Sequence, residues 1–189
     1  MNGKIETPLY YIPQFTDVQK FYPDYDNKLK NELLFVGVAH FKRLAPLYAV
    51  KNNFPIAVHG SASGQVGVGP GSYIENGILR KYYTSAKINL NDTMPSMREF
   101  GFVSNRIYDV AASGGFIISD DIDGLEEIFG DAVPIYRNEK EFVKLVKFYL
   151  NNPKAREEKI KKAREITLSE YTNEKAALQF EKVFQDLEK

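Results

Sequence analysis

Two adjacent cations, Lys42 and Arg43, have the residue types and the position needed to bind a phosphate group. They follow the apolar run ELLFVG (residues 32–37), which predicts a buried strand that ends at a glycine. A guanidinium group binds phosphate oxygens bidentately, and parallel sheets bind ligands at the loops that follow their strands. The alternative is a pair of solvated side chains at the start of the next helix, where a cation is unfavourable. We therefore expect Arg43, together with Lys42, to bind a diphosphate.

A second candidate phosphate site lies at residues 104–109, in the sequence SNRIYD. Ser104 or Asn105 can cap a helix that runs from Arg106 onwards, and the free N–H groups of a first helical turn attract anions. Asp109 falls one turn inside this helix, where its carboxylate is placed to accept hydrogen bonds from both ribose hydroxyls. An aspartate there also stabilises the N-terminal half of a helix without any ligand, and this is the alternative for Asp109.

Residues near these two groups complete the predicted pocket. Gly37 and Gly60 each end a predicted strand, and a glycine allows a ligand to approach the backbone closely. His40 shares the loop of Lys42 and is a further candidate. The glycine-rich segment from Gly60 lacks the Gly-Lys-Ser/Thr ending of a P-loop, and no helix follows at the offset of a dinucleotide fingerprint, so both motifs are excluded.

Three aspartates, Asp120, Asp121 and Asp123, follow the apolar run at residues 116–118. Carboxylates are the ligands that Mg²⁺ prefers. However, Asp123 and Glu126 have the spacing of a capping box, and capping plus a solvated turn explains the cluster. We expect no bound metal and no cofactor.

Strands and helices alternate along the chain and would position these residues. Five apolar runs predict strands, at residues 32–37, 56–60, 87–90, 116–118 and 132–136. The last is expected at an edge, because Pro134 cannot donate to a strand ladder. Asn138 and Thr172 are expected to cap helices in the C-terminal part. The pattern predicts an α/β fold with a Rossmann-like parallel sheet and helices on both faces.

The composition narrows the class of protein. The 189 residues are enough for one substantial domain, here residues 31–189, preceded by a lead-in segment at residues 1–30. The 25 Lys+Arg balance the 25 Asp+Glu, so a nucleic-acid partner is not expected. The absence of cysteine excludes disulfides and thiol catalysis. No apolar run is long enough to span a membrane and no signal peptide is evident, so we expect a cytoplasmic protein.

The order of motifs around the second phosphate site carries a family resemblance. Gly101, the pair Asn105-Arg106, Asp109, and then Ala112-Ser113-Gly114 are followed by a strand and by DGLEE at residues 123–127. This pattern resembles the C-terminal, nucleotide-sugar-binding domain of a GT-B glycosyltransferase. It is most similar to the group-1-like branch that includes CgeB-type proteins.

The resemblance implies a reaction and a division of roles. A glycosyl group would pass from a nucleotide diphosphate sugar, whose pyrophosphate Lys42 and Arg43 would hold and whose ribose Asp109 would bind. Tyr73 and Ile74 lie where such proteins hold the nucleobase. The family also carries a glutamate at the position of Gly101, where this chain has no carboxylate, and catalytic residues stay unassigned.

The resemblance also implies a missing partner. Residues 11–23 resemble the segment that crosses between the two GT-B domains, whereas the residues alone suggest a strap across the sheet edge. The chain would then lack an N-terminal acceptor domain and would bind donor weakly and turn over little. The alternatives are a non-catalytic nucleotide-binding or regulatory module on the same fold, and an unrelated doubly wound protein that binds another phosphorylated ligand.

Overall fold

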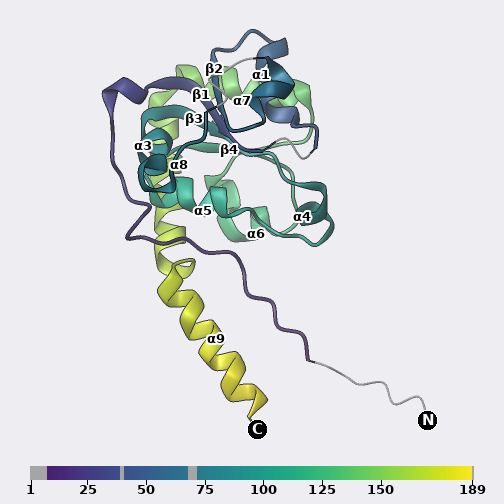
Figure 1. Cartoon of the computed structure of the whole chain (residues 1–189), viewed down its shortest axis with the longest axis vertical. Helices are drawn as coiled ribbons and strands as arrows, with labels where there is room; N and C mark the ends of the chain where they lie inside the picture. The colour runs from purple at the N-terminus through teal and green to yellow at the C-terminus, as the bar shows by residue number, and fades with distance from the viewer. Residues whose placement is uncertain (1–7, 39–40, 68–71, 189) are drawn as a thin grey trace, which may run out of the picture.

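The computed structural model describes residues 8–38, 41–67 and 72–188. Within these residues a five-stranded sheet of order β2-β1-β3-β4-β5 forms the centre, and each neighbouring pair is parallel (Figure 1). The strands are β1 (Asn31–Val36), β2 (Ile56–His59), β3 (Ala86–Leu90), β4 (Ile117–Asp120) and β5 (Ile135–Tyr136). The predicted α/β fold is confirmed, and β5 lies at the edge as expected.

Helices connect the strands and continue to the C-terminus. Those among the described residues are η1 (Asn27–Leu29), α1 (Leu44–Lys51), α2 (Ser63–Val66), α3 (Asn76–Ser85), α4 (Pro95–Glu99), α5 (Asn105–Ala112), α6 (Leu125–Phe129), η2 (Gly130–Ala132), α7 (Glu139–Asn151), α8 (Pro153–Glu170) and α9 (Asn173–Leu187). None of the helices in the described part of the chain combines the length and the apolar character needed to cross a membrane.

The two faces of the sheet carry separate hydrophobic cores. Leu33 and Phe35 of β1 are buried in the core that contains residues of α1 and α7. Leu34 is buried in the other core, with residues of α3, α5 and α6. Successive side chains of a strand point to opposite faces, so helices on both sides require a continuously apolar strand. This explains why the central strands read as apolar runs.

The strand order predicts at which edge of the sheet a ligand binds. From β1 the chain moves outward to β2, and it then returns to add β3 on the other side of β1. In open parallel sheets, ligands bind outside the carboxyl ends of the two strands at which this direction reverses. Here these strands are β1 and β3. They are followed by the loops that contain Lys42 and Arg43 and residues 91–93.

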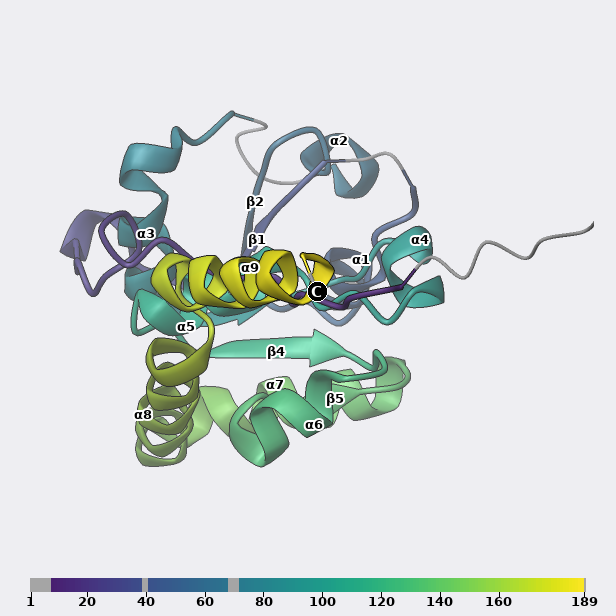
Figure 2. The same cartoon turned by 90° about the horizontal axis from the view of Figure 1, so that it is seen from below.

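The lead-in segment packs on the domain. Thr16 pairs with Thr172 in an isolated parallel bridge at the start of α9. Phe21 stacks on Tyr83 of α3, with 6.4 Å between ring centroids. In Figure 1, α9 extends away from the sheet, and the N-terminal segment leaves on the same side. Figure 2 shows α9 crossing in front of the strands. The assignment of residues 1–30 as an interdomain linker stays a prediction.

Helix capping confirms most of the sequence expectations and corrects one. Asn138 caps α7, since its Oδ1 accepts a hydrogen bond from Glu141 N at 3.0 Å. Thr172 caps α9 in the same way. The predicted capping box of Asp123 and Glu126 is wrong, because Gly124 precedes α6 and no side chain caps it. Gly124 has φ +87, a left-handed conformation that favours glycine, and this turn starts the helix one residue later than predicted.

Candidate functional site

Arg43 lies at the carboxyl edge of the sheet but is almost fully buried, with 3% of its surface exposed. Its Nε donates to the carbonyl of Val38 at 2.9 Å, and its Nη1 donates to the carbonyl of Asp92 at 2.7 Å. The guanidinium also lies 3.9 Å from the centroid of the Phe41 ring. Burial, followed by the charge of Arg106, lowers the pKa of Arg43 to about 10, so the group stays charged at neutral pH. Arg43 therefore holds the loop after β1 against the loop after β3.

Arg106 lies beside Arg43. Both guanidinium groups lie over the ring of Phe35, at 5.2 Å for Arg106 and 5.7 Å for Arg43. Arg106 Nη1 donates to Asn91 Oδ1 at 2.8 Å, which fixes the side chain across the end of β3. Two positive charges are thus held near each other at the switch point between β1 and β3.

Gly37 and Gly60 lie in close contact at the ends of β1 and β2. A Cβ on Gly60 would lie 2.4 Å from the carbonyl oxygen of Gly37, and a Cβ on Gly37 would lie 3.4 Å from Arg106 Nη2. Gly60 has φ +80, which a residue with a side chain rarely adopts. The ends of β1 and β2 are therefore packed too closely for a side chain at either position.

The start of α5 contributes the remaining predicted phosphate and ribose groups. Ser104 caps the helix, with its Oγ accepting from Arg106 N at 3.4 Å. Asn105 is exposed and donates from Nδ2 to the carbonyl of Phe15 at 3.4 Å. Asp109 is half-buried, and its Oδ1 accepts from Thr16 Oγ1 at 2.7 Å. The sequence candidates on α5 therefore share one edge with Arg43 and Arg106.

The predicted nucleobase region divides into an exposed residue and a core residue. Tyr73 is 78% exposed, whereas Ile74 is 6% exposed and belongs to the core on the α5 side of the sheet. The preceding carbonyl, that of Ser72, accepts a hydrogen bond from Gly60 N at 3.0 Å, so Tyr73 begins close to the end of β2. His40 and residues 68–71 of the glycine-rich loop lie outside the described residues.

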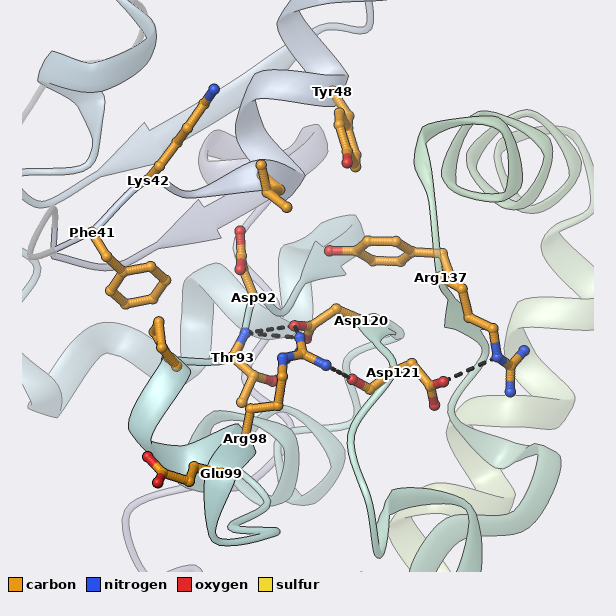
Figure 3. Close-up of a pocket in the computed structure, with 13 residues that line it drawn as sticks. Phe41, Lys42, Tyr48, Asp92, Thr93, Arg98, Glu99, Asp120, Asp121 and Arg137 are labelled. Carbon is orange, nitrogen blue, oxygen red and sulfur yellow. Dashed lines mark hydrogen bonds and ion pairs between the residues drawn. The ribbon is translucent and has the colours of Figure 1, made fainter.

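A pocket of about 690 Å³ opens on the α1 side of the same edge (Figure 3). Its wall includes Lys42 from the loop after β1, Glu99 from the end of α4, and the aromatic rings of Tyr48 and Tyr136. Among the described residues, no hydrogen-bond or ion-pair partner is found for the ammonium group of Lys42 or the carboxylate of Glu99. Lys42 and Glu99 thus lie at the rim of the pocket, and in Figure 3 both side chains point away from the other lining residues.

Two carboxylates, Asp92 and Asp120, hold the floor of this pocket. Asp92 was not a sequence candidate, and the prediction that Asp120 belongs to a solvated turn is wrong, because Asp120 is buried. Asp120 accepts hydrogen bonds from Thr93 N and from Thr93 Oγ1, the latter at 2.8 Å, and pairs with Arg98. Asp92 Oδ2 accepts from Ala45 N at 2.9 Å and so satisfies the start of α1. Burial raises the pKa of Asp92. These carboxylates tie the loop after β3 to β4 and to α1.

A signal for this network was present in the sequence. The polar run Asn91-Asp92-Thr93 directly follows the predicted strand at residues 87–90. The same reasoning that selected Lys42 after the first strand applies to it. The helix α4, which supplies Arg98, was not predicted; Pro95 at its first turn is its only strong sequence signal.

The position of Gly101 explains the missing carboxylate in conformational terms. Gly101 has φ +62, and its backbone N donates to the carbonyl of Arg98 at 3.2 Å at the end of α4. A residue with a side chain would be strained there. Glu99, two residues earlier, is one of the residues that line the pocket. The resemblance implies a glutamate at position 101, whereas this chain has its carboxylate two residues earlier, at Glu99.

The fold and this edge together define a Rossmann-like α/β domain of the kind that binds a ligand at a topological switch point. A family model described as glycosyl transferase-like matches residues 42–182. The chain therefore belongs to the glycosyl transferase-like family. A search of curated protein sequences returns no match.

Solved structures of glycosyltransferases share the fold. A sucrose-phosphate synthase from Thermosynechococcus elongatus aligns with TM-score 0.70 and 15% identity over 93% of this chain and 52% of its own. A T4 phage BGT mutant in complex with UDP-glucose aligns with TM-score 0.64 and 14% identity, over 92% and 50%. The C-terminal domain of a glycosyl transferase group 1 family protein from Francisella tularensis aligns with TM-score 0.62 and 13% identity, over 84% and 99%.

These matches confirm the resemblance to the C-terminal half of GT-B glycosyltransferases at the level of fold. The chain spans about half the length of the first two structures and nearly all of the isolated C-terminal domain. The CgeB-like branch stays a prediction.

Proposed function

We propose that the chain is the nucleotide-sugar-binding half of a glycosyltransferase, which transfers a glycosyl group from a nucleotide diphosphate sugar to an acceptor. The observation that carries this proposal is the pair Arg43 and Arg106, held over one phenylalanine ring at the β1/β3 switch point. A structure of similar fold is described as a complex with UDP-glucose, which agrees with this ligand class.

The parts of the donor are assigned by charge and position. Arg106, Lys42 and the N–H groups at the start of α5 bind the diphosphate, and the buried Arg43 adds positive charge behind them. Fixed positive charge at this place stabilises the negative charge that grows on the departing diphosphate. Asp109 binds the ribose, and the nucleobase lies near the exposed Tyr73.

The glycosyl group is assigned to the pocket of Figure 3. This pocket opens beside Lys42, which would bind the adjoining phosphate. Carboxylate oxygens accept hydrogen bonds from sugar hydroxyls, and Glu99 is the carboxylate in the pocket wall without a partner among the described residues. Replacement of Glu99 by Gln should then weaken binding of UDP-glucose more than binding of UDP.

The proposal includes a second domain of the same polypeptide that carries the acceptor. Helix α9 presents Phe180, Phe184 and Leu187 to solvent, with 44%, 62% and 56% of their surfaces exposed. Exposed apolar residues gathered on one helix mark a surface that another protein surface covers. The chain alone should therefore bind the donor weakly and show little turnover.

Calorimetric titration of the chain with UDP, GDP and ADP tests the proposal. We expect one of the three to bind and expect Arg106→Gln to weaken that binding by roughly tenfold, since it removes a charged hydrogen-bond donor. Lys162→Gln, which changes an exposed cation on α8, serves as the matched control. Equal loss in both variants would point to general charge attraction, and no binding of any nucleotide would oppose the proposal.

We propose that binding needs no metal ion, because cationic side chains supply the charge at the diphosphate position. Addition of EDTA should leave the nucleotide affinity unchanged, and addition of Mg²⁺ should not increase it by more than about twofold. A tenfold gain with Mg²⁺ would show that a metal shares the diphosphate.

A non-catalytic nucleotide-binding module is the second candidate, and the absence of a carboxylate at Gly101 favours it. The two candidates differ in whether the sugar is recognised. If UDP-glucose or GDP-linked sugars bind no more tightly than the free nucleotide, and Glu99→Gln has no effect, the module is the better description.

A further inference from the structure

We propose that Thr16 is a positioning residue for ribose recognition: its hydroxyl orients the carboxylate of Asp109, so the N-terminal segment forms part of the nucleotide site. This inference rests on the proposed function, in which Asp109 binds the ribose. It assigns a role to a residue that lies 93 positions away in the sequence and in a segment outside the sheet.

The backbone of Thr16 is fixed on both sides. Its N–H donates to the carbonyl of Tyr171 at 2.9 Å, and its carbonyl accepts from Asn173 N at 3.0 Å. These bonds anchor it at the junction of α8 and α9, and the residue is 1% exposed. A side chain with so little freedom keeps its hydroxyl pointed in one direction.

That direction is toward Asp109. Thr16 Oγ1 donates to Asp109 Oδ1 at 2.7 Å, a length typical of a strong hydrogen bond to a carboxylate. Asp109 Oδ2 has no hydrogen-bond partner among the described residues. It is not one of the fully buried side-chain oxygens and nitrogens that lack a partner. One carboxylate oxygen is therefore occupied, and the other is left without a partner among the described residues.

A hydrogen bond to one oxygen of a carboxylate restricts the rotation of its plane. Such a carboxylate accepts hydrogen bonds from a ribose better than one that rotates freely. The charges near Asp109 are those of Arg106 on α5 and Asp17 on the N-terminal segment, and the titratable but neutral phenol of Tyr83 on α3 lies near the same groups. Burial raises the pKa of Asp109 to about 7, and the Thr16 hydrogen bond opposes this rise. Thr16 thus also keeps more of the carboxylate ionised at neutral pH.

The test compares Thr16→Val, which removes the hydroxyl at nearly constant volume, with Thr16→Ser, which retains it. Each variant and the unaltered chain are titrated calorimetrically with UDP, GDP and ADP and with their 2′-deoxy forms. We expect the unaltered chain to prefer the ribonucleotide by about tenfold, the contribution of one hydrogen bond to a charged group. The preference should fall to near one in Thr16→Val and persist in Thr16→Ser.

A second measurement separates positioning from folding. The pKa of Asp109, followed by carboxyl ¹³C NMR without nucleotide, should rise above about 7 in Thr16→Val and stay unchanged in Thr16→Ser, because only valine removes the bond. A native NMR spectrum of Thr16→Val confirms that the variant folds.

The outcomes are distinguishable. If nucleotide binds and its ribose preference survives Thr16→Val, the role of Thr16 is wrong while the proposed function stands. An unchanged pKa in Thr16→Val also overturns the role of Thr16. If no nucleotide binds to the unaltered chain, both the proposed function and the ribose role of Thr16 fail.

Discussion

At the scale of single residues, Asp109 has the most unusual electrostatic state in the candidate site. Its pKa is raised from 3.8 to about 7, mainly because the carboxylate is buried, although Thr16 and Arg106 favour its charged form. A carboxylate that stays partly protonated near neutral pH weakens the fold when it ionises. Perturbed groups of this kind gather at functional sites, where the cost is retained for the sake of binding.

This state predicts a pH dependence of stability that Asp109→Asn should remove. The folded pKa lies above the unfolded one, so the stabilisation is fully present below about pH 4 and is lost as the pH rises through about 7. The free energy of unfolding of the unaltered chain, relative to Asp109→Asn, should fall by roughly 2–4 kcal/mol over this range. Urea unfolding of both proteins at a series of pH values measures it. A constant difference would mean that Asp109 titrates normally.

Gly115 makes a second prediction at this scale. A Cβ there would lie 2.6 Å from the carbonyl oxygen of Tyr83 and 2.9 Å from Asn89 Nδ2, in the interior of the sheet. Gly115→Ala should lower the free energy of unfolding by about 2 kcal/mol or more, because the backbone of α3 must move. Gly77→Ala is the control: nothing lies within 4 Å of its Cβ, and alanine in α3 should stabilise by about 0.5–1 kcal/mol. Thermal unfolding of both variants compares them.

At the scale of elements, the loop after β3 connects β4, α1 and α4. Asp120 is 7% exposed and accepts hydrogen bonds from Thr93 and Asn91 in addition to its pair with Arg98. Asp92 joins the same loop to the start of α1. The wall of the pocket thus depends on contacts between elements rather than on any one of them.

Asp120→Ala should therefore destabilise the chain by about 2–4 kcal/mol, since it leaves the buried N–H and hydroxyl of Thr93 without their acceptor. The neighbouring Asp121→Ala provides the comparison. Its carboxylate is about half exposed and pairs with Arg137 at 3.0 Å, so its removal should cost about 0–1 kcal/mol. Chemical unfolding of the two variants gives the difference, and similar losses would show that the Asp120 network is not cooperative.

The elements that were predicted well are those with strong local signals. Asn138 with Glu141 and the apolar run of β1 determine their elements within a few residues, because the capping bond and the burial pattern are local. The helices α2 and α4 were missed because each is four or five residues long and carries little periodicity. The turn at Gly124 was misassigned because its left-handed φ depends on the packing of the whole loop.

The same distinction applies to the candidate site. The sequence located Arg43 at the carboxyl edge but did not reveal that its guanidinium would bond to the carbonyls of Val38 and Asp92, since burial is a property of the assembled loops. The contact of Thr16 with Asp109 joins segments 93 residues apart, and no periodicity or motif encodes it. Residue types predict which chemistry is present, and tertiary contacts decide which groups remain available.

At the scale of the whole molecule, the N-terminal segment and α9 lie on the same side of the domain (Figure 1). They meet at the bridge between Thr16 and Thr172, next to Asp109 on α5. Under the proposed function, a domain that docks on α9 would therefore lie near the segment that contacts Asp109. The start of α9 and the residue on α5 are thus joined through one residue of the N-terminal segment.

The N-terminal segment should then be required for the stability of the domain, and truncation tests this. A chain that begins at residue 31 loses the packing of Phe21 on Tyr83, the Asp24–Arg80 ion pair at 2.8 Å, and the Thr16 bonds to Tyr171 and Asp109. We expect its free energy of unfolding to fall by at least about 3 kcal/mol, the sum expected for one buried aromatic and several hydrogen bonds.

A chain that begins at residue 14 is the matched control, because it keeps each of these contacts and removes only residues that precede them. It should be as stable as the full chain to within about 0.5 kcal/mol. Urea unfolding, monitored by tyrosine fluorescence and circular dichroism, compares the three proteins. If the chain from residue 31 is as stable as the full chain, residues 14–30 form a separable linker and the domain begins at β1. If only that chain is destabilised, residues 14–30 belong to the fold and unfold together with the sheet as one cooperative unit.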